Sequence, residues 1–240
     1  MKFRYVAFGA ALYALSGCVN PTEEVGLLDF TDITPPSPVI KINPNMRSVE
    51  FIIDTSRSMN EKVDGTRKID SARASLRVIL DMYDEHNDRF RNIQAGLLSY
   101  SGGQVVETVP FGDFDHAALA GSLDGLKPSG NTPLGTSLAH AESILNRSHG
   151  GRYVVALTDG KNTDRINPGS LLGKINEINA STGDAPTNIY IIAFNTDASF
   201  QGLVDQGATL YHAADALKLT EILKQVTGEI LPEAIGPDAF

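Results

Sequence analysis

This sequence of 240 residues has a single cysteine and fewer basic than acidic residues. Its single cysteine, Cys18, excludes an internal disulfide and a zinc cluster of thiolates, so the fold must depend on a hydrophobic core. Lysine and arginine number 20 against 29 aspartates and glutamates, which gives a formal net charge of -9. Nucleic-acid binding needs clustered basic side chains, so this acidic balance argues against a nucleic acid as the partner.

The sequence also lacks the usual marks of hydrolytic and nucleotide-binding sites. No serine stands in a Gly-x-Ser-x-Gly elbow, the marker of many Ser-His-Asp hydrolases. The histidines are scattered and show no metal-ligand spacing. Residues 125–131 imitate the spacing of a phosphate-binding loop but carry Asn131 in place of the lysine, so nucleotide binding is not expected there.

The first residues have the layout of a secretory signal that ends in a lipid attachment site. Lys2 and Arg4 precede an apolar run over residues 5–15, which is shorter than the roughly 20 residues that span a bilayer. The run leads into a Leu-Ser-Gly-Cys18 tetrapeptide, which resembles the bacterial lipobox, whose cysteine is acylated and becomes the mature N-terminus. We therefore expect a lipoprotein signal peptide over residues 1–17 and lipidation at Cys18. An ordinary signal peptide that contains a cysteine is the alternative.

A lipid on Cys18 predicts a protein that is anchored to a membrane of the cell envelope. Val19 stands where an aspartate would mark retention at the inner membrane of Gram-negative bacteria. The same resemblance therefore favours the outer membrane, with the protein facing the periplasm or the surface. Residues 18–47 hold five prolines in a polar stretch, which predicts a semi-extended tether, although residues 39–42 could instead pack against the domain.

Apolar runs and helical patterns alternate over residues 48–230. Continuous apolar runs predict strands that are buried on both faces, at 49–54, 93–100, 153–158 and 189–194, with a short one at 209–212. Residues 105–109 follow the second run across a Gly-Gly pair, which predicts a hairpin. Apolar positions at helical spacing predict helices at 69–83, with Thr66 as N-cap, and at 115–126, 133–145, 171–179 and 219–230.

This alternation predicts an α/β fold, namely a doubly wound, mostly parallel open sheet with one antiparallel edge strand. We expect one domain over residues 48–230 and a C-terminal tail over 231–240. In such sheets a ligand binds beyond the carboxyl ends of the strands, where the strand order switches.

Three loops at that edge carry oxygen-bearing side chains. Asp54, Ser56 and Ser58 follow the first strand in an Asp-x-Ser-x-Ser pattern, Thr132 lies in a later loop, and Asp159 follows the strand at 153–158. Two carboxylates and three hydroxyls suit a hard cation such as Mg²⁺, which prefers octahedral oxygen coordination. Each piece alone is weak, because Asp54 could cap backbone amides, Thr132 could be a helix N-cap and Asp159 could begin an ordinary turn.

Together, the three loops resemble the metal-ion-dependent adhesion site of von Willebrand factor A domains. The resemblance implies that Ser56, Ser58 and Thr132 ligate the metal directly, and that Asp54 and Asp159 hold it largely through waters or hydrogen bonds. It also implies that the sixth position takes an acidic side chain of a protein partner. The expected cofactor is a divalent cation, Mg²⁺ first, with Mn²⁺ or Ca²⁺ as alternatives.

Many members of the family have glycine where Arg57 stands. Arginine at this position either weakens metal binding or helps to hold an acidic partner, and the sequence leaves both open. The favoured function is a metal-dependent binding module and not an enzyme. A metal-assisted hydrolase or phosphoryl-transfer enzyme, and a structural envelope lipoprotein without metal-dependent ligand binding, are the alternatives.

Overall fold

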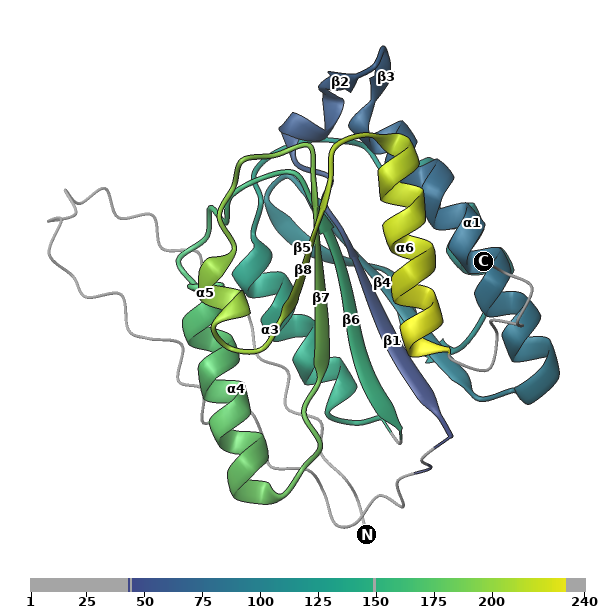
Figure 1. The fold of residues 1–240 in the computed structure, drawn as a ribbon, viewed down its shortest axis with the longest axis vertical. Coiled ribbons are helices and arrows are strands. Elements are labelled where there is room, and N and C mark those ends of the chain that lie inside the picture. Colours follow the sequence, from purple (N-terminus) through teal and green to yellow (C-terminus); the bar gives the residue numbers. More distant parts are fainter. Residues whose placement is uncertain (1–42, 44, 149, 232–240) are drawn as a thin grey trace, which may run out of the picture. The chain divides into compact units, whose positions relative to one another are not determined.

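The computed structural model describes residues 43, 45–148 and 150–231 (Figure 1). The predicted signal peptide, Cys18, nearly all of the predicted tether and the tail beyond Leu231 lie outside these residues. No helix in the described ranges is long and apolar enough to cross a membrane.

The centre of the domain is a six-stranded sheet in the order β5-β4-β1-β6-β7-β8. Neighbouring strands are parallel except for β5, which is antiparallel to β4 at the edge. The strands are β1 (Arg47–Ile53), β4 (Ile93–Ser101), β5 (Gln104–Asp113), β6 (Gly151–Thr158), β7 (Asn188–Phe194) and β8 (Thr209–Ala213). The predicted fold class and the predicted hairpin are therefore confirmed.

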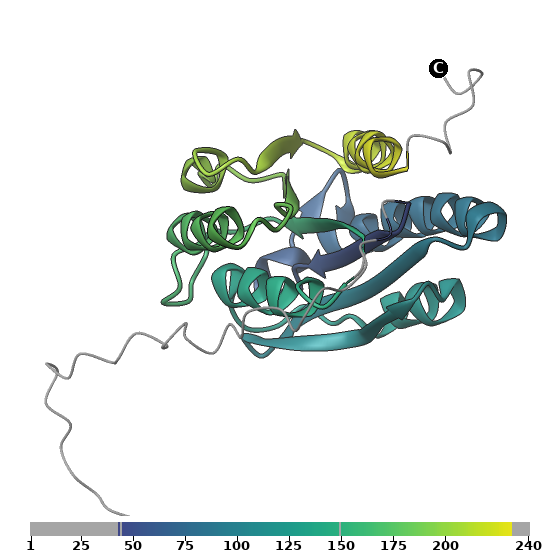
Figure 2. The same cartoon turned by 90° about the horizontal axis from the view of Figure 1, so that it is seen from below.

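Helices cover both faces of the sheet and make three layers (Figures 1 and 2). One face carries α1 (Lys68–Phe90), α2 (His116–Ser122) and α6 (Ala216–Ile230). The other face carries α3 (Leu134–Leu145), α4 (Pro168–Thr182) and the short α5 (Gln201–Val204). The described residues also form two short 3-10 turns, η2 (Arg57–Asn60) and η3 (Leu123–Gly125).

A hydrophobic core cluster lies between the sheet and the layer of α1 and α6. Alternate residues of β1, namely Val49, Phe51 and Ile53, point into this cluster and are almost fully buried. Phe51 meets the ring of Tyr83 from α1 edge to face, with the ring centroids 5.6 Å apart. Each fully buried large side chain contributes about 1.5–3 kcal/mol, so this layer fixes β1 in the centre of the sheet.

The start of α1 differs from the prediction. Thr66 is not the N-cap, because it belongs to a small hairpin formed by β2 (Lys62–Val63) and β3 (Thr66–Arg67). The two strands are joined by an Asp-Gly turn in which both residues have positive φ, 51° at Asp64 and 83° at Gly65. That geometry matches the right-handed twist of a two-residue hairpin, so the chain turns back before the helix begins at Lys68. This hairpin extends beyond the edge of the main sheet (Figure 1).

Candidate metal site

The predicted site residues lie at the carboxyl edge of the sheet, where the strand order switches. After β1 the chain continues to β4 and β5 on one side, and after β5 it crosses to β6 on the other side of β1. Asp54 directly follows β1 and its amide still bonds to the carbonyl of Leu157, 2.9 Å away in β6. Asp159 directly follows β6. The two aspartates are therefore brought together by the pairing of these two strands.

Asp54 organises the loop that follows it. Its side chain is fully buried, and Oδ1 accepts a hydrogen bond from the backbone amide of Ser56 at 2.7 Å. Oδ2 accepts the hydroxyl of Thr158 at 2.7 Å. Burial raises the pKa of Asp54, the hydrogen bonds from Ser56 and Thr158 act to lower it, and the charge of Asp159 adds to the increase. Asp54 therefore does cap a backbone amide, that of Ser56, but this is only one of its contacts.

The hydroxyl groups gather between the two aspartates. Oγ of Ser56 and Oγ of Ser58 are 3.1 Å apart, and Ser58 donates to Oδ1 of Asp159 at 2.6 Å. A Cβ added at Gly160 would lie 3.1 Å from Oγ1 of Thr132 and 3.9 Å from Oγ of Ser58. The structure therefore places all of the predicted metal-site residues around one point.

Thr132 reaches this point because its loop is fastened to the neighbouring loops. The amide of Ser129 donates to the carbonyl of Thr55 at 2.7 Å, and the amide of Arg57 donates to the carbonyl of Gly130 at 3.2 Å. Gly130 has a φ of 70°, and a Cβ there would lie 2.4 Å from the amide nitrogen of Gly103. Only glycine combines this backbone conformation with such close packing.

The alternative role of Thr132 as a helix N-cap is wrong. α3 begins at Leu134, and the residue at its N-cap position is Pro133. The backbone of Thr132 is held instead by Thr163, whose Oγ1 accepts the amide of Thr132 at 2.9 Å and whose amide donates to the carbonyl of Thr132 at 2.9 Å. Thr132 is 4% exposed, and these backbone bonds leave its side chain free to border the site.

Three contacts of the site were not identified from the sequence. Thr158 supports Asp54, as described above. Thr55 anchors the loop from the opposite side, because its hydroxyl donates to the carbonyl of Tyr100 and accepts the Tyr100 amide. Lys68 is the third, and its Nζ lies 3.0 Å from Oδ2 of Asp159 and 3.0 Å from Oε2 of Glu61.

Lys68 places a buried positive charge beside the site. The residue is only 3% exposed. Burial acts to lower the pKa of Lys68, but hydrogen bonds and charge interactions with Asp159 and Glu61 outweigh burial, so the pKa is raised. The ammonium group therefore remains protonated, and it neutralises part of the negative charge of the aspartates.

The donor set fits a hard divalent cation. All five predicted side chains offer oxygen, and the two serine oxygens, 3.1 Å apart, match the spacing of about 2.9 Å between adjacent ligands of octahedral Mg²⁺. Within the described ranges, no group of three or more His, Cys, Asp and Glu side chains is placed to hold a metal. A cation here would accordingly be held by two carboxylates and neutral hydroxyls.

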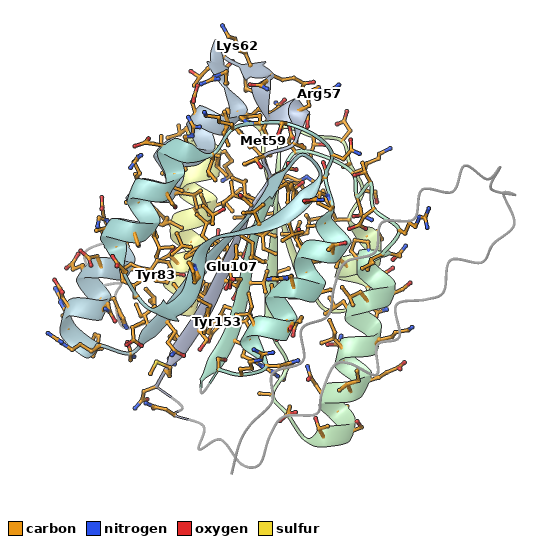
Figure 3. The ribbon with its side chains drawn as sticks, turned by 180° about the vertical axis from the view of Figure 1, so that it is seen from behind. Arg57, Met59, Lys62, Tyr83, Glu107 and Tyr153 are labelled. Atoms are coloured by element: carbon orange, nitrogen blue, oxygen red, sulfur yellow. The ribbon has the colours of Figure 1, made fainter. Side chains whose placement is uncertain are left out.

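A cleft of about 760 Å³ opens beside the site. On one side, the cleft is bordered by Asp159 and by the segment between β1 and β2. On the other side, it is bordered by the carboxyl ends of β7 and β8. Its lining includes Glu61, Lys68, Asp159, Lys161, Asn195 and His212. Arg57 is exposed at the same edge of the molecule, close to the hairpin residue Lys62 (Figure 3).

Comparison with known proteins shows which α/β domains this one resembles. Residues 49–161 match the family model described as von Willebrand factor type A domain. This range contains every predicted metal-site residue. These residues therefore resemble a von Willebrand factor type A domain, in keeping with the α/β fold described above.

Known proteins resemble this chain at low sequence identity. YwmD of Bacillus subtilis (strain 168), described as uncharacterized, is 29% identical over 171 residues, which are 67% of this chain and 74% of YwmD. The pilus adhesin SpaC from Lactobacillus rhamnosus GG has a TM-score of 0.63 at 15% identity, over 80% of this chain and 31% of SpaC. This chain thus spans only about a third of that adhesin.

Two further structures match almost over their whole length. The SpRpn10 VWA domain has a TM-score of 0.60 at 16% identity, over 75% of this chain and 95% of that domain. The vWF domain of the type V pili tip protein Mfa5 from Porphyromonas gingivalis also has a TM-score of 0.60 at 12% identity. The match covers 82% of this chain and 99% of that domain. At these identities the likeness concerns the fold.

Proposed function

We propose that this chain is a lipid-anchored envelope protein whose von Willebrand factor type A domain binds a protein partner through a divalent cation, Mg²⁺ being the expected one. The observation that carries the proposal is that oxygen-bearing side chains from three separate loops lie close together. Their meeting point lies where α/β sheets bind ligands.

The side chains divide into two groups. Ser56, Ser58 and Thr132 would hold the cation through hydroxyl oxygens, and Asp54 and Asp159 would balance its charge. Hydroxyls add no negative charge, so a bound cation would supply an exposed positive charge that attracts a carboxylate of the partner. Exposed Arg57 at the same edge adds a second positive charge toward such a carboxylate.

Binding is favoured over catalysis. The two aspartates of the site have each of their oxygens occupied by a hydrogen bond, which leaves them as holding groups. Three of the structural neighbours are, by name, a pilus adhesin, a minor pilin from Streptococcus sanguinis and a pili tip protein. One observation supports the enzymatic alternative, since His212 lines the same cleft as Asp159 and histidine is a common general acid or base.

Calorimetry on the purified full chain tests the metal site. We expect one-site binding of Mg²⁺ and Mn²⁺ that is lost in Asp54→Asn and Thr132→Ala and kept in Ser129→Ala, a change in the same loop at an exposed position. Circular dichroism verifies that each variant is folded. Equal binding by the natural chain and by Asp54→Asn would contradict the site.

Capture from envelope extracts tests the partner. A partner retained with Mg²⁺ should be released by a chelator and should not bind Thr132→Ala. If capture survives both treatments, the binding does not use this cation. If the metal changes only the heat stability and no partner is captured, the structural alternative is favoured. Turnover of model phosphate or ester substrates that needs Mg²⁺ and His212 would instead support an enzyme.

Lipid attachment at Cys18 is tested separately, because that residue lies outside the described ranges. Expression of the chain and of Cys18→Ser with a radiolabelled fatty acid should label only the natural chain. The label should travel with the membrane fraction. An unlabelled natural chain would favour an ordinary signal peptide.

A further inference from the structure

We infer that Lys68 determines how strongly this site holds a divalent cation and how strongly the loaded site depends on an anionic partner. The inference rests on the proposed function, and the charge arrangement around Asp159 carries it. Oδ1 of Asp159 accepts the Ser58 hydroxyl at 2.6 Å, and Oδ2 accepts the Lys68 ammonium at 3.0 Å. One of the two carboxylates of the site is therefore already paired with a full positive charge.

Burial makes this pairing strong. The side chain of Lys68 is 4% exposed and that of Asp159 is 0% exposed, so solvent screens the pair little. The second partner of Lys68 differs in this respect, because the side chain of Glu61 is 67% exposed and its charge is largely screened. Asp159 is thus the partner that dominates the electrostatics of the ammonium group.

The backbone keeps Lys68 at this place. Lys68 is the first residue of α1, and its amide donates to the carbonyl of Glu61 at 2.9 Å. This bond closes the base of the β2–β3 hairpin, whose Asp-Gly turn fixes the register of the two strands. The hairpin therefore delivers the lysine to Asp159, next to the Asp-x-Ser-x-Ser loop.

The charge balance gives the functional consequence. With both aspartates ionised, Asp54, Asp159 and Lys68 together carry a single negative charge. A divalent cation would leave the site with one net positive charge, whereas the same site without the lysine would be neutral. Lys68 consequently weakens cation binding by repulsion and leaves a charge that an incoming carboxylate can balance.

Substitution of Lys68 by methionine tests this directly, because methionine keeps an unbranched apolar stem and removes the charge. In calorimetry of the full chain, Lys68→Met should bind Mg²⁺ and Mn²⁺ at least about tenfold more tightly than the natural chain. Lys62→Met, which removes an equal charge from an exposed position of the same hairpin, should change the affinity less than about twofold. Lys68→Gln provides a second variant if Lys68→Met does not fold.

Acetate serves as the probe for the carboxylate of a partner. Acetate should raise the apparent Mg²⁺ affinity of the natural chain and have a smaller effect on folded Lys68→Met. Metal binding by Lys68→Met that is no tighter than that of the natural chain overturns the inference and leaves the proposed function standing. If Lys68→Met binds metal and the natural chain does not, the inference is supported and metal-dependent binding by the natural chain is contradicted. If neither protein binds metal, both proposals fail.

Discussion

The hydroxyl of Ser58 donates to Oδ1 of Asp159 at 2.6 Å, although 101 positions of sequence separate the two residues. Ser58 lies in the loop after β1 and Asp159 in the loop after β6, and these strands are neighbours only because the strand order switches between them. The bond therefore depends on the topology of the whole sheet. It also joins two of the groups that are proposed to hold a cation.

Loss of the Ser58 hydroxyl should remove the effect of metal on stability. A cation that binds only the folded chain stabilises it by RT ln(1 + c/Kd), where c is the cation concentration, so the melting temperature rises with that concentration. We expect Mg²⁺ to raise the melting temperature of the natural chain, a chelator to reverse the shift, and Ser58→Ala to show no shift. Ser143→Ala, on the exposed side of α3, should keep it. Ser58→Ala with an undiminished shift would mean that the cation binds elsewhere.

Thr158 should matter for stability because it supports a buried carboxylate. Its hydroxyl donates to Oδ2 of Asp54 at 2.7 Å, and both residues are 0% exposed. Thr158→Val keeps the shape of the side chain but leaves that oxygen without its donor, which should cost about 1–3 kcal/mol in the free energy of unfolding. Urea denaturation measures this loss. Thr158→Ser restores the donor and should recover most of the stability, and an equal loss in both variants would indicate a packing effect instead.

Gly130 should be required for the position of Thr132. A Cβ at residue 130 would lie 2.4 Å from the amide nitrogen of Gly103, and the φ of 70° disfavours any side chain. We expect Gly130→Ala to lower the free energy of unfolding by more than about 1 kcal/mol and to weaken Mg²⁺ binding. Gly125→Ala is the matched control, because no atom lies within 4 Å of a Cβ there. Equal effects of the two changes would contradict this reasoning.

The order of strands and helices could be predicted because the central strands contain apolar runs, while the edge strand β5 was indicated by the Gly-Gly pair before it. Such runs are buried on both faces, so the sheet, its antiparallel edge and the edge where ligands bind all followed from the pattern. The meeting of Asp54 and Asp159 was predictable for the same reason, since each directly follows a central strand. The distances and hydrogen bonds of these two aspartates could not be predicted, because they depend on the register of the strands.

Lys68 was not predictable from its neighbourhood in the sequence. A lysine next to Arg67 at the start of a helix is usually solvated, and burial here depends on the β2–β3 hairpin and on Asp159, 91 positions away. The hairpin itself has a sequence signal, because Asp64-Gly65 is a favoured two-residue turn. Thr66 is a good helix N-cap by residue type, but it is the strand residue that follows this turn.

Glu50 also escaped notice, since one glutamate hardly alters an apolar run. It lies in β1 and is 0% exposed, and neither of its carboxyl oxygens has a hydrogen-bond partner among the described residues. Its β4 neighbour is Gly96, and a Cβ there would lie 2.5 Å from Oε2 of Glu50. The glycine therefore provides the space for the carboxyl group. Burial, and then the charge of Glu107, raise the pKa of Glu50 to about 9.

This raised pKa predicts that stability falls as the pH rises. The folded chain keeps the proton of Glu50 up to about pH 9, whereas the unfolded chain loses it near the ordinary value of 4.5. The free energy of unfolding should therefore decrease through that window. Glu50→Gln removes this slope and should be more stable than the natural chain by roughly 4–5 kcal/mol at pH 8, with little difference at pH 4.5. Urea denaturation at both pH values measures the two slopes, with Glu177→Gln, an exposed position on α4, as the control for a general charge effect. Parallel curves for the natural chain and Glu50→Gln would show that Glu50 is ionised in the folded state and that its charge is balanced by other means.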